Sequence, residues 1–300
     1  MNLPLLIPLA EITAPDLASF EQRLGGQFGF ILALYGAVFA IGLCLLIAFT
    51  LRIQSQPLDW TGPVRRLEWR PWSLADAARI IVPLILLQII FAALISLVKG
   101  ADYAEQEGSE KVLLILQSLL FHWTGFLLVV TSLYRRRLTW LAGFGLASRG
   151  AVVHAAWGVL ILLGVMPLVL GYNIVAHMVM EWMGHTPEVQ DVTRIITETS
   201  GPAAKLYLAL LALVIAPVVE EILFRGVLLP AFTRAAGVKP AIVAVSLLFA
   251  MVHGHWPSFV PLFMLSVALC LAYIYRGSLV VSMAMHACFN GLTVAVILKM

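Results

Sequence analysis

Long apolar stretches separated by short polar ones run along the whole chain of 300 residues. A transmembrane helix needs roughly 20 consecutive apolar residues. The pattern therefore predicts an all-α fold, a polytopic membrane helix bundle of about eight transmembrane helices. The fifth helix is expected to continue to residue 236. The predicted spans cover residues 28–51, 80–98, 112–133, 152–180, 205–229, 240–256, 258–275 and 279–298.

The composition agrees with a membrane protein. Hydrophobic residues make up 61% of the chain and charged residues only 12%, whereas about a quarter of a soluble domain is charged. The net charge of +3 gives no indication of a nucleic-acid partner, and we expect none. We divide the chain into N-terminal membrane helices with an outer loop, residues 1–203, and a candidate catalytic core, residues 204–300. The outer loop 181–204 is partly amphipathic and could form an interfacial helix.

The distribution of basic residues predicts the orientation in the membrane, because Lys and Arg favour cytoplasmic loops. With eight spans, one set of loops carries 13 of the 19 Lys and Arg residues and the other set carries 6. Both termini are therefore expected on the non-cytoplasmic side. The compact chain with short loops leads us to expect a multi-pass protein of a bacterial inner membrane.

The stretch VIAPVVEEILFRGVLL places three charged residues, Glu220, Glu221 and Arg225, in an apolar helix. A charge at the centre of a transmembrane helix costs ~2.5–3.5 kcal/mol, so these side chains must face protein or a water-filled cavity. Glu221 and Arg225 are four residues apart and are predicted to pair. Glu220 is rotated by about 100° from Glu221 and is predicted to be a free functional carboxylate. Pro217 is expected to disturb the helix just before them.

Two later apolar helices carry further polar pairs at a spacing of four residues. The stretch LLFAMVH contains Phe249 and His253, and MHACFNG contains His286 and Asn290. Ionisable residues inside a membrane are candidates for function by default. We therefore expect these side chains to converge with Glu220. Three histidines of the earlier apolar helices are interpreted as packed side chains with a local hydrogen bond: His122, His154 and His177.

This set of side chains suits the hydrolysis of an amide by activated water. Glu220 and His253 could hold one water molecule, and Glu220 could take its proton and return it to the leaving amine. His286 and Asn290 carry donors for the developing oxyanion. Neither a covalent nucleophile nor a cofactor is needed.

The three motifs resemble those of the CAAX-protease and bacteriocin-processing family, often called CPBP or Abi. EEILFR (Glu220 to Arg225) matches its EExxxR motif, FAMVH (Phe249 to His253) its FxxxH motif, and HACFN (His286 to Asn290) its HxxxN motif. The resemblance covers roughly residues 204–298. The best-known eukaryotic member removes the last three residues from prenylated CaaX proteins.

The resemblance implies a glutamate-dependent intramembrane endopeptidase, related to the type II CAAX prenyl endopeptidases. It implies that Glu220 and His253 activate water, and that His286 and Asn290 form the oxyanion site. Glu221 and Arg225, with Phe249 of the second motif, would support the site. The implied partners are the lipid bilayer and a substrate that is a peptide or a membrane-associated or lipid-modified protein. No oligomeric state is predicted.

Two other interpretations remain open. Glu220, His253 and His286 could bind zinc with a water molecule in the fourth position, although no HExxH motif is present. Alternatively, a non-enzymatic membrane protein could bind a peptide, a bacteriocin or a partner enzyme in the same polar cavity. In that case the loop 181–204 could act as a lid or a docking surface. A purely structural role for both glutamates is also possible, since buried ion pairs can serve helix packing alone.

Overall fold

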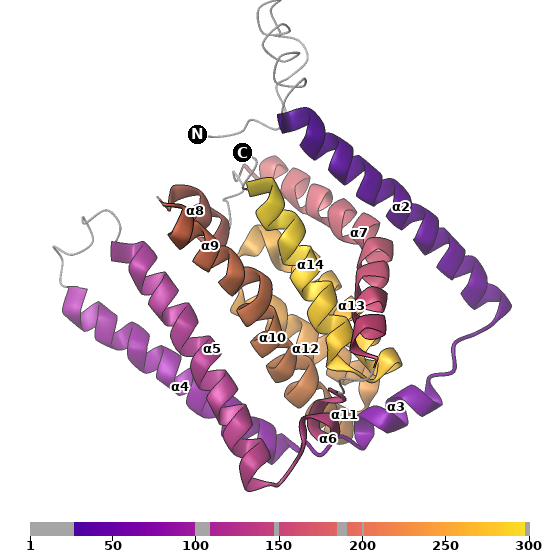
Figure 1. Cartoon of the computed structure of the whole chain (residues 1–300), viewed down its shortest axis with the longest axis horizontal. Helices are drawn as coiled ribbons and strands as arrows, with labels where there is room; N and C mark the ends of the chain where they lie inside the picture. Colours follow the sequence, from indigo (N-terminus) through magenta and orange to yellow (C-terminus); the bar gives the residue numbers. More distant parts are fainter. Residues whose placement is uncertain (1–26, 100–108, 147–149, 185–190, 200, 298–300) are drawn as a thin grey trace, which may run out of the picture.

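The computed structural model describes residues 27–99, 109–146, 150–184, 191–199 and 201–297, and Figure 1 shows them as a bundle of helices. No strand occurs within these ranges. The helices are α2 (Gln27–Ser55), α3 (Thr61–Glu68), α4 (Leu74–Lys99), α5 (Ser109–Arg135), α6 (Trp140–Phe144), α7 (Ala151–Trp182), α8 (Asp191–Glu198), α9 (Pro202–Leu210), η2 (Leu211–Ile215), α10 (Ala216–Glu221), η3 (Ile222–Leu228), α11 (Leu229–Ala236), α12 (Val238–Val252), η4 (Trp256–Ser258), α13 (Phe259–Arg276) and α14 (Leu279–Ile297).

Each of the eight predicted spans coincides with a helix, and the chain is an integral multi-pass membrane protein. Six helices in the described ranges are long and apolar enough to cross a membrane, and α12 and α14 are shorter apolar helices. The sixth predicted span ends at Val252, earlier than expected, because Gly254 adopts a left-handed conformation with φ 60° and begins the turn to η4. The 15 residues of α12 extend only about 22 Å. This is shorter than a hydrocarbon core of about 30 Å, so α12 by itself is too short to cross one.

The helix α7 packs against α2 on one side and against α13 and α14 on the other. Figure 1 shows α2 at one edge of the bundle and the α4–α5 hairpin at the opposite edge. The α4–α5 hairpin reaches the centre because α5 packs against α10 and α4 packs against η3. The largest buried cluster surrounds Ile222 to Leu229, so the segment that carries the charged residues lies at the centre of the core.

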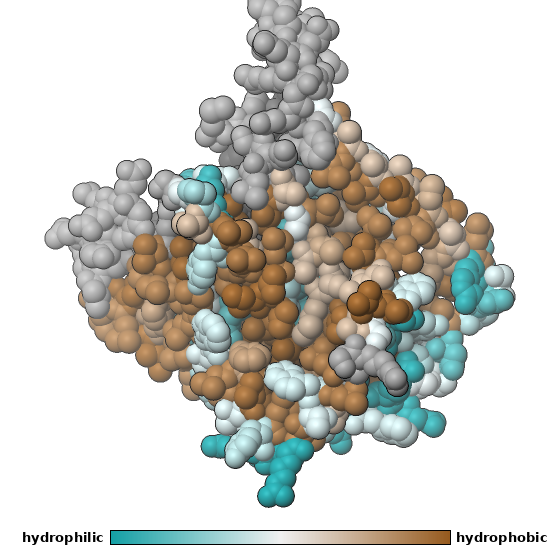
Figure 2. All heavy atoms as spheres, viewed as in Figure 1, coloured by the Kyte–Doolittle hydropathy of each residue, from teal (hydrophilic) through white to brown (hydrophobic). Residues whose placement is uncertain are grey.

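The surface has the polarity expected of a protein in lipid. Apolar side chains cover the flanks of the bundle in Figure 2, and hydrophilic ones gather near the end that holds α3 and α6. Arginines tie the helices together at this end: Arg66 donates to the carbonyl of Tyr275 at 2.9 Å, and Arg70 donates to that of Gly277 at 2.7 Å. Arg225, which the loop count included, is instead fully buried in the bundle. The excess of Lys and Arg in one set of loops is therefore smaller by one residue, and the predicted orientation is unchanged.

The outer loop contains a short helix, α8, as its amphipathic pattern predicted. Its apolar residues Ile195 and Ile196 are buried against Leu208 of α9 and Val294 of α14. This face therefore packs on the bundle and covers one end of it.

Close contact between α7 and α14 depends on Gly158. A Cβ atom at this position would lie 2.4 Å from the carbonyl oxygen of Val281, whereas a Cβ atom at Gly171 of the same helix would meet nothing within 4 Å. Small residues permit such close approach of membrane helices. We expect Gly158→Val to destabilise the protein by about 1–3 kcal/mol through overpacking. Thermal unfolding in detergent measures this, with Gly171→Val as the matched control; equal losses in both variants would contradict the packing argument.

Candidate active site

The helix that carries the three charged residues contains two π-helical segments. It continues from Pro202 to Ala236, and the α-helical turn of Glu220 and Glu221 lies between two π-helical segments, η2 and η3. π-Helical segments are rare and occur frequently at functional sites. The expected disturbance at Pro217 thus takes the form of π-helical turns in an unbroken helix.

Asn290 compensates for the donor that Pro217 lacks. In η2 the amide of Ala216 donates to the carbonyl of Leu211, five residues earlier. The same pattern would pair residue 217 with the carbonyl of Ala212, but proline has no N–H group. The Nδ2 atom of Asn290 donates to this carbonyl at 2.8 Å. Asn290 therefore joins α14 to the helix of the glutamates and has one N–H group left.

Glu221 and Arg225 form the ion pair that their spacing predicts. Arg225 Nη1 lies 2.6 Å from Glu221 Oε1, and both side chains are 0% exposed. Arg225 Nη2 also donates to Ser266 Oγ of α13 at 2.7 Å. The guanidinium lies over the ring of Phe249, 4.5 Å from its centroid. Arg225 thus links the central helix to α12 and α13.

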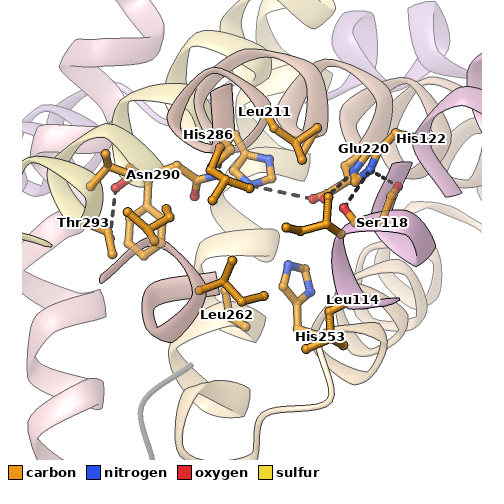
Figure 3. Close-up of a pocket in the computed structure, with 18 residues that line it drawn as sticks. Leu114, Ser118, His122, Leu211, Glu220, His253, Leu262, His286, Asn290 and Thr293 are labelled. Atoms are coloured by element: carbon orange, nitrogen blue, oxygen red, sulfur yellow. Dashed lines mark hydrogen bonds and ion pairs between the residues drawn. The ribbon is translucent and has the colours of Figure 1, made fainter. Parts of the chain in front are cut away.

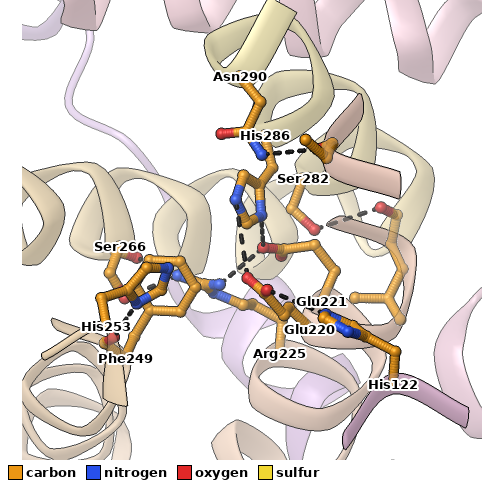
Figure 4. A network of polar contacts seen from close by, with 12 residues as sticks. His122, Glu220, Glu221, Arg225, Phe249, His253, Ser266, Ser282, His286 and Asn290 are labelled. Carbon is orange, nitrogen blue, oxygen red and sulfur yellow. Dashed lines mark hydrogen bonds and ion pairs between the residues drawn. The ribbon is translucent and has the colours of Figure 1, made fainter. Parts of the chain in front are cut away.

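Glu220 is not part of this pair and is flanked by two imidazoles, of which that of His286 also contacts Glu221 (Figure 4). Its Oε1 atom lies 3.4 Å from His122 Nε2, and its Oε2 atom lies 3.8 Å from His286 Nε2. Its side chain is 15% exposed, whereas that of Glu221 is 0% exposed. The two adjacent glutamates therefore have different surroundings, as the helical rotation predicts.

Glu220 opens into a cavity of about 280 Å³ that also contacts His253, His286 and Asn290. Figure 3 shows these side chains around one space. Phe249 lies fully buried behind them, with its ring centroid 4.6 Å from that of His253 and 5.6 Å from that of His286. The structure thus brings together the four residues that the sequence analysis placed in one site.

His122 is packed and bonded locally to Ser118, as interpreted from the sequence, but it also lines this cavity, which the sequence did not indicate. It comes from α5, in the region assigned to the N-terminal helices, and its side chain is 6% exposed. Nothing in the spacing of residues around it indicates the site, because its contact to Glu220 spans 98 residues of sequence. The cavity therefore draws on both regions of the chain.

All three histidines of the cavity are oriented through their Nδ1 atoms. Nδ1 of His122 lies 2.6 Å from the carbonyl of Ser118, and Nδ1 of His253 lies 2.6 Å from the carbonyl of Phe249. Nδ1 of His286 lies 3.1 Å from Glu221 Oε1. A carbonyl or carboxylate oxygen only accepts, so each Nδ1 carries the proton. In its neutral form each imidazole therefore has its lone pair on Nε2.

The described residues contain no group of three or more His, Cys, Asp or Glu side chains arranged to hold a metal ion. The candidate zinc ligands Glu220, His253 and His286 line one cavity without forming such a group. What the site offers is a carboxylate, an imidazole with a free lone pair and a primary amide around one space. This combination suits general acid–base chemistry on a water molecule.

Residues 202–292 match the family model described as Type II CAAX prenyl endopeptidase Rce1-like. No curated protein and no solved structure matches the chain. The matched region includes the three motifs and excludes α5, which supplies His122.

Proposed function

We propose that the protein is a glutamate-type intramembrane endopeptidase, because residues 202–292 match the Type II CAAX prenyl endopeptidase Rce1-like family, a family of proteases. One observation carries the proposal: the carboxylate of Glu220 opens into a cavity that also contacts His253 and Asn290, inside a membrane bundle. A buried carboxylate without a function would be a costly feature of such a helix. The substrate in this proposal is a peptide or a membrane-associated or lipid-modified protein.

In the proposed reaction a water molecule binds between Glu220 and His253. Glu220 takes one proton as the water oxygen bonds to the carbonyl carbon of the scissile peptide. The same proton then passes to the amide nitrogen as the carbon–nitrogen bond breaks, which leaves a new carboxyl terminus and a new amine. His253 orients the water through the lone pair of Nε2, since its Nδ1 proton is held by the carbonyl of Phe249.

The oxyanion in this scheme accepts a hydrogen bond from the second N–H group of Asn290. The first N–H group is already used on Ala212, and this bond fixes the direction of the amide. His286 can contribute a second donor only as an imidazolium, because its Nδ1 proton is directed at Glu221. Glu220 and Glu221 on either side of the ring would balance that charge.

The proposed reaction uses no metal ion. The zinc alternative would engage Glu220 as a ligand and remove it as the base. Incubation of the purified protein with a peptide library, followed by mass spectrometry of the products, tests both points. We expect cleavage that persists after treatment with a zinc chelator. No cleavage of any peptide would favour the binding-protein alternative, and cleavage lost on chelation and restored by zinc would favour the metalloprotease.

The cavity extends from Glu220 toward the end of the bundle that holds α8. Its lining there includes Ile195 and Ile196 of α8, Leu208 of α9 and Val294 of α14. The arginine-rich end with α3 and α6 lies opposite (Figure 1). If the basic end is cytoplasmic, as the charge rule indicates, the substrate reaches Glu220 from the non-cytoplasmic side.

This orientation predicts that the C-terminus after Met300 lies outside the cytoplasm. An alkaline phosphatase fused there, which folds only in an oxidising compartment, is expected to be active in a bacterial host. The same enzyme fused in the turn after Arg276 should be inactive. The reverse pattern would overturn the orientation without affecting the chemistry proposed for Glu220.

A further inference from the structure

His122 makes a contact that the three motifs do not explain. It belongs to α5, outside the residues that match the family, and its Nε2 atom lies 3.4 Å from Glu220 Oε1. The ring is held from the other side, since Nδ1 lies 2.6 Å from the carbonyl of Ser118 one turn earlier. The edge of Phe121 packs against it at 5.3 Å between ring centroids. The imidazole is therefore fixed in one orientation with Nε2 directed at the carboxyl group.

The contact between His122 and Glu220 requires a proton between the two side chains. The carbonyl of Ser118 only accepts, so Nδ1 of His122 carries a proton. A neutral imidazole then presents a lone pair to Glu220, and an ionised carboxylate also presents a lone pair. Two acceptors do not form a hydrogen bond. The contact is favourable only when the pair holds one further proton, either on Nε2 of His122 or on Oε1 of Glu220.

We propose that His122 is a positioning residue that shares one proton with Glu220 and fixes its carboxyl group for catalysis. Oε1 is held by His122, and the carboxyl group is thereby oriented so that Oε2 is the atom available to the water molecule. This inference rests on the proposed function of Glu220 as the base. The step requires the shared proton to be on Nε2 of His122, so that Glu220 is ionised when it acts as the base. The proton taken from water goes to Oε2 and then to the leaving nitrogen, and the shared proton is still on Nε2 at the end.

Other charged or titratable groups act on the same carboxyl group. His286 of α14 lies 3.8 Å from Oε2, and His253 faces the cavity from the end of α12. Glu221 and Arg225 neutralise each other beside them. Of these groups, His122 is the one with a hydrogen-bond contact to Oε1, at 3.4 Å.

Two substitutions by amide residues each remove one of the two hydrogen bonds of His122 and keep the other. In His122→Gln the side-chain nitrogen reaches the position of Nε2 and can still donate to Glu220, but the anchor on Ser118 is lost. In His122→Asn the nitrogen reaches only the position of Nδ1, so the anchor is kept and the contact to Glu220 is lost. The exchange His177→Asn in α7, away from the cavity, is the control for replacing a membrane histidine.

The assay uses a quenched fluorescent peptide that spans a site cut in the library experiment, with purified protein in detergent. We expect His122→Asn to lower kcat roughly ten- to a hundredfold with little change in KM, as a misplaced catalytic group does. His122→Gln should keep most of kcat near neutral pH. The pH dependence of kcat in His122→Gln should differ from that of the wild-type protein, because the glutamine amide cannot take up or release the shared proton. His177→Asn should match wild type in rate and in pH profile.

The outcomes separate this inference from the proposed function. Wild-type kcat in His122→Asn, or equal losses in both variants together with lowered thermal stability, would overturn the positioning role. If His122→Asn fails to fold, the pH profile of His122→Gln decides, and an unchanged profile would overturn the shared proton. If His122→Gln fails to fold, kcat of His122→Asn decides, and a wild-type value would overturn the positioning role. Glu220→Gln in the same assay tests the premise independently: retained cleavage there would defeat the proposed function itself.

Discussion

Replacing Glu220 by glutamine is expected to abolish peptide cleavage without unfolding the protein. The same change at Glu221 is expected to lower the stability of the fold. Glutamine at 220 keeps the size and polarity of the side chain but cannot take a proton from water. General-base catalysis contributes roughly 10²–10⁴-fold to a rate, so cleavage should fall by at least this factor. The side chain faces a cavity, and the imidazoles of His122 and His286 beside it can each release a proton, so the change leaves no fixed buried charge without a partner.

Glu221→Gln removes the charge that balances Arg225 in a fully buried pair. Breaking such a pair from one side costs about 3–5 kcal/mol. Thermal unfolding in detergent and the cleavage rate, measured on both variants, test the contrast. Cleavage retained in Glu220→Gln would contradict its role as the base. A stable Glu221→Gln protein would contradict the structural role of the pair.

Replacing Arg225 by methionine is expected to destabilise the protein more than any other single change in this site. The substitution leaves Glu221 as an uncompensated buried charge, which costs about 3–5 kcal/mol. It also removes the donor to Ser266 of α13 and the cation that covers the ring of Phe249. The helices that carry the site would lose the side chain that connects them.

The double variant Glu221→Gln with Arg225→Met isolates the electrostatic part of this loss. With both charges removed, the double variant is expected to be more stable than Arg225→Met alone, because no buried charge is left without a partner. The free energies of unfolding of the two single variants and the double variant, measured by titration with a denaturing detergent, form the cycle. Losses that simply add would show that the pair is not coupled.

Much of this fold follows from the sequence because lipid imposes a strong rule. Each apolar stretch must satisfy its own backbone hydrogen bonds as a helix, so the eight predicted spans coincide with helices. The rotation between Glu220 and Glu221 and the pairing of Glu221 with Arg225 follow from helical geometry alone. The early end of α12 was missed because it depends on the left-handed conformation of Gly254.

The parts of the site that the sequence did not indicate depend on contacts between distant helices. The position of His122 beside Glu220 is set by the packing of α5 against α10, for which no local pattern exists. The bond between Asn290 and Ala212 requires a π-helical turn before Pro217, and hydropathy does not reveal such a turn. The cover that α8 places over one end of the cavity likewise depends on tertiary packing.

The most direct test of the central claim is a comparison of protein termini in membranes of cells that carry either the wild-type protein or Glu220→Gln. Mass spectrometry of all new N- and C-termini detects cleavage products whatever the substrate is. Our account predicts a set of termini that appears only with the wild-type protein, at equal abundance of the two proteins. Identical sets of termini would contradict the claim that Glu220 drives the hydrolysis of a peptide bond.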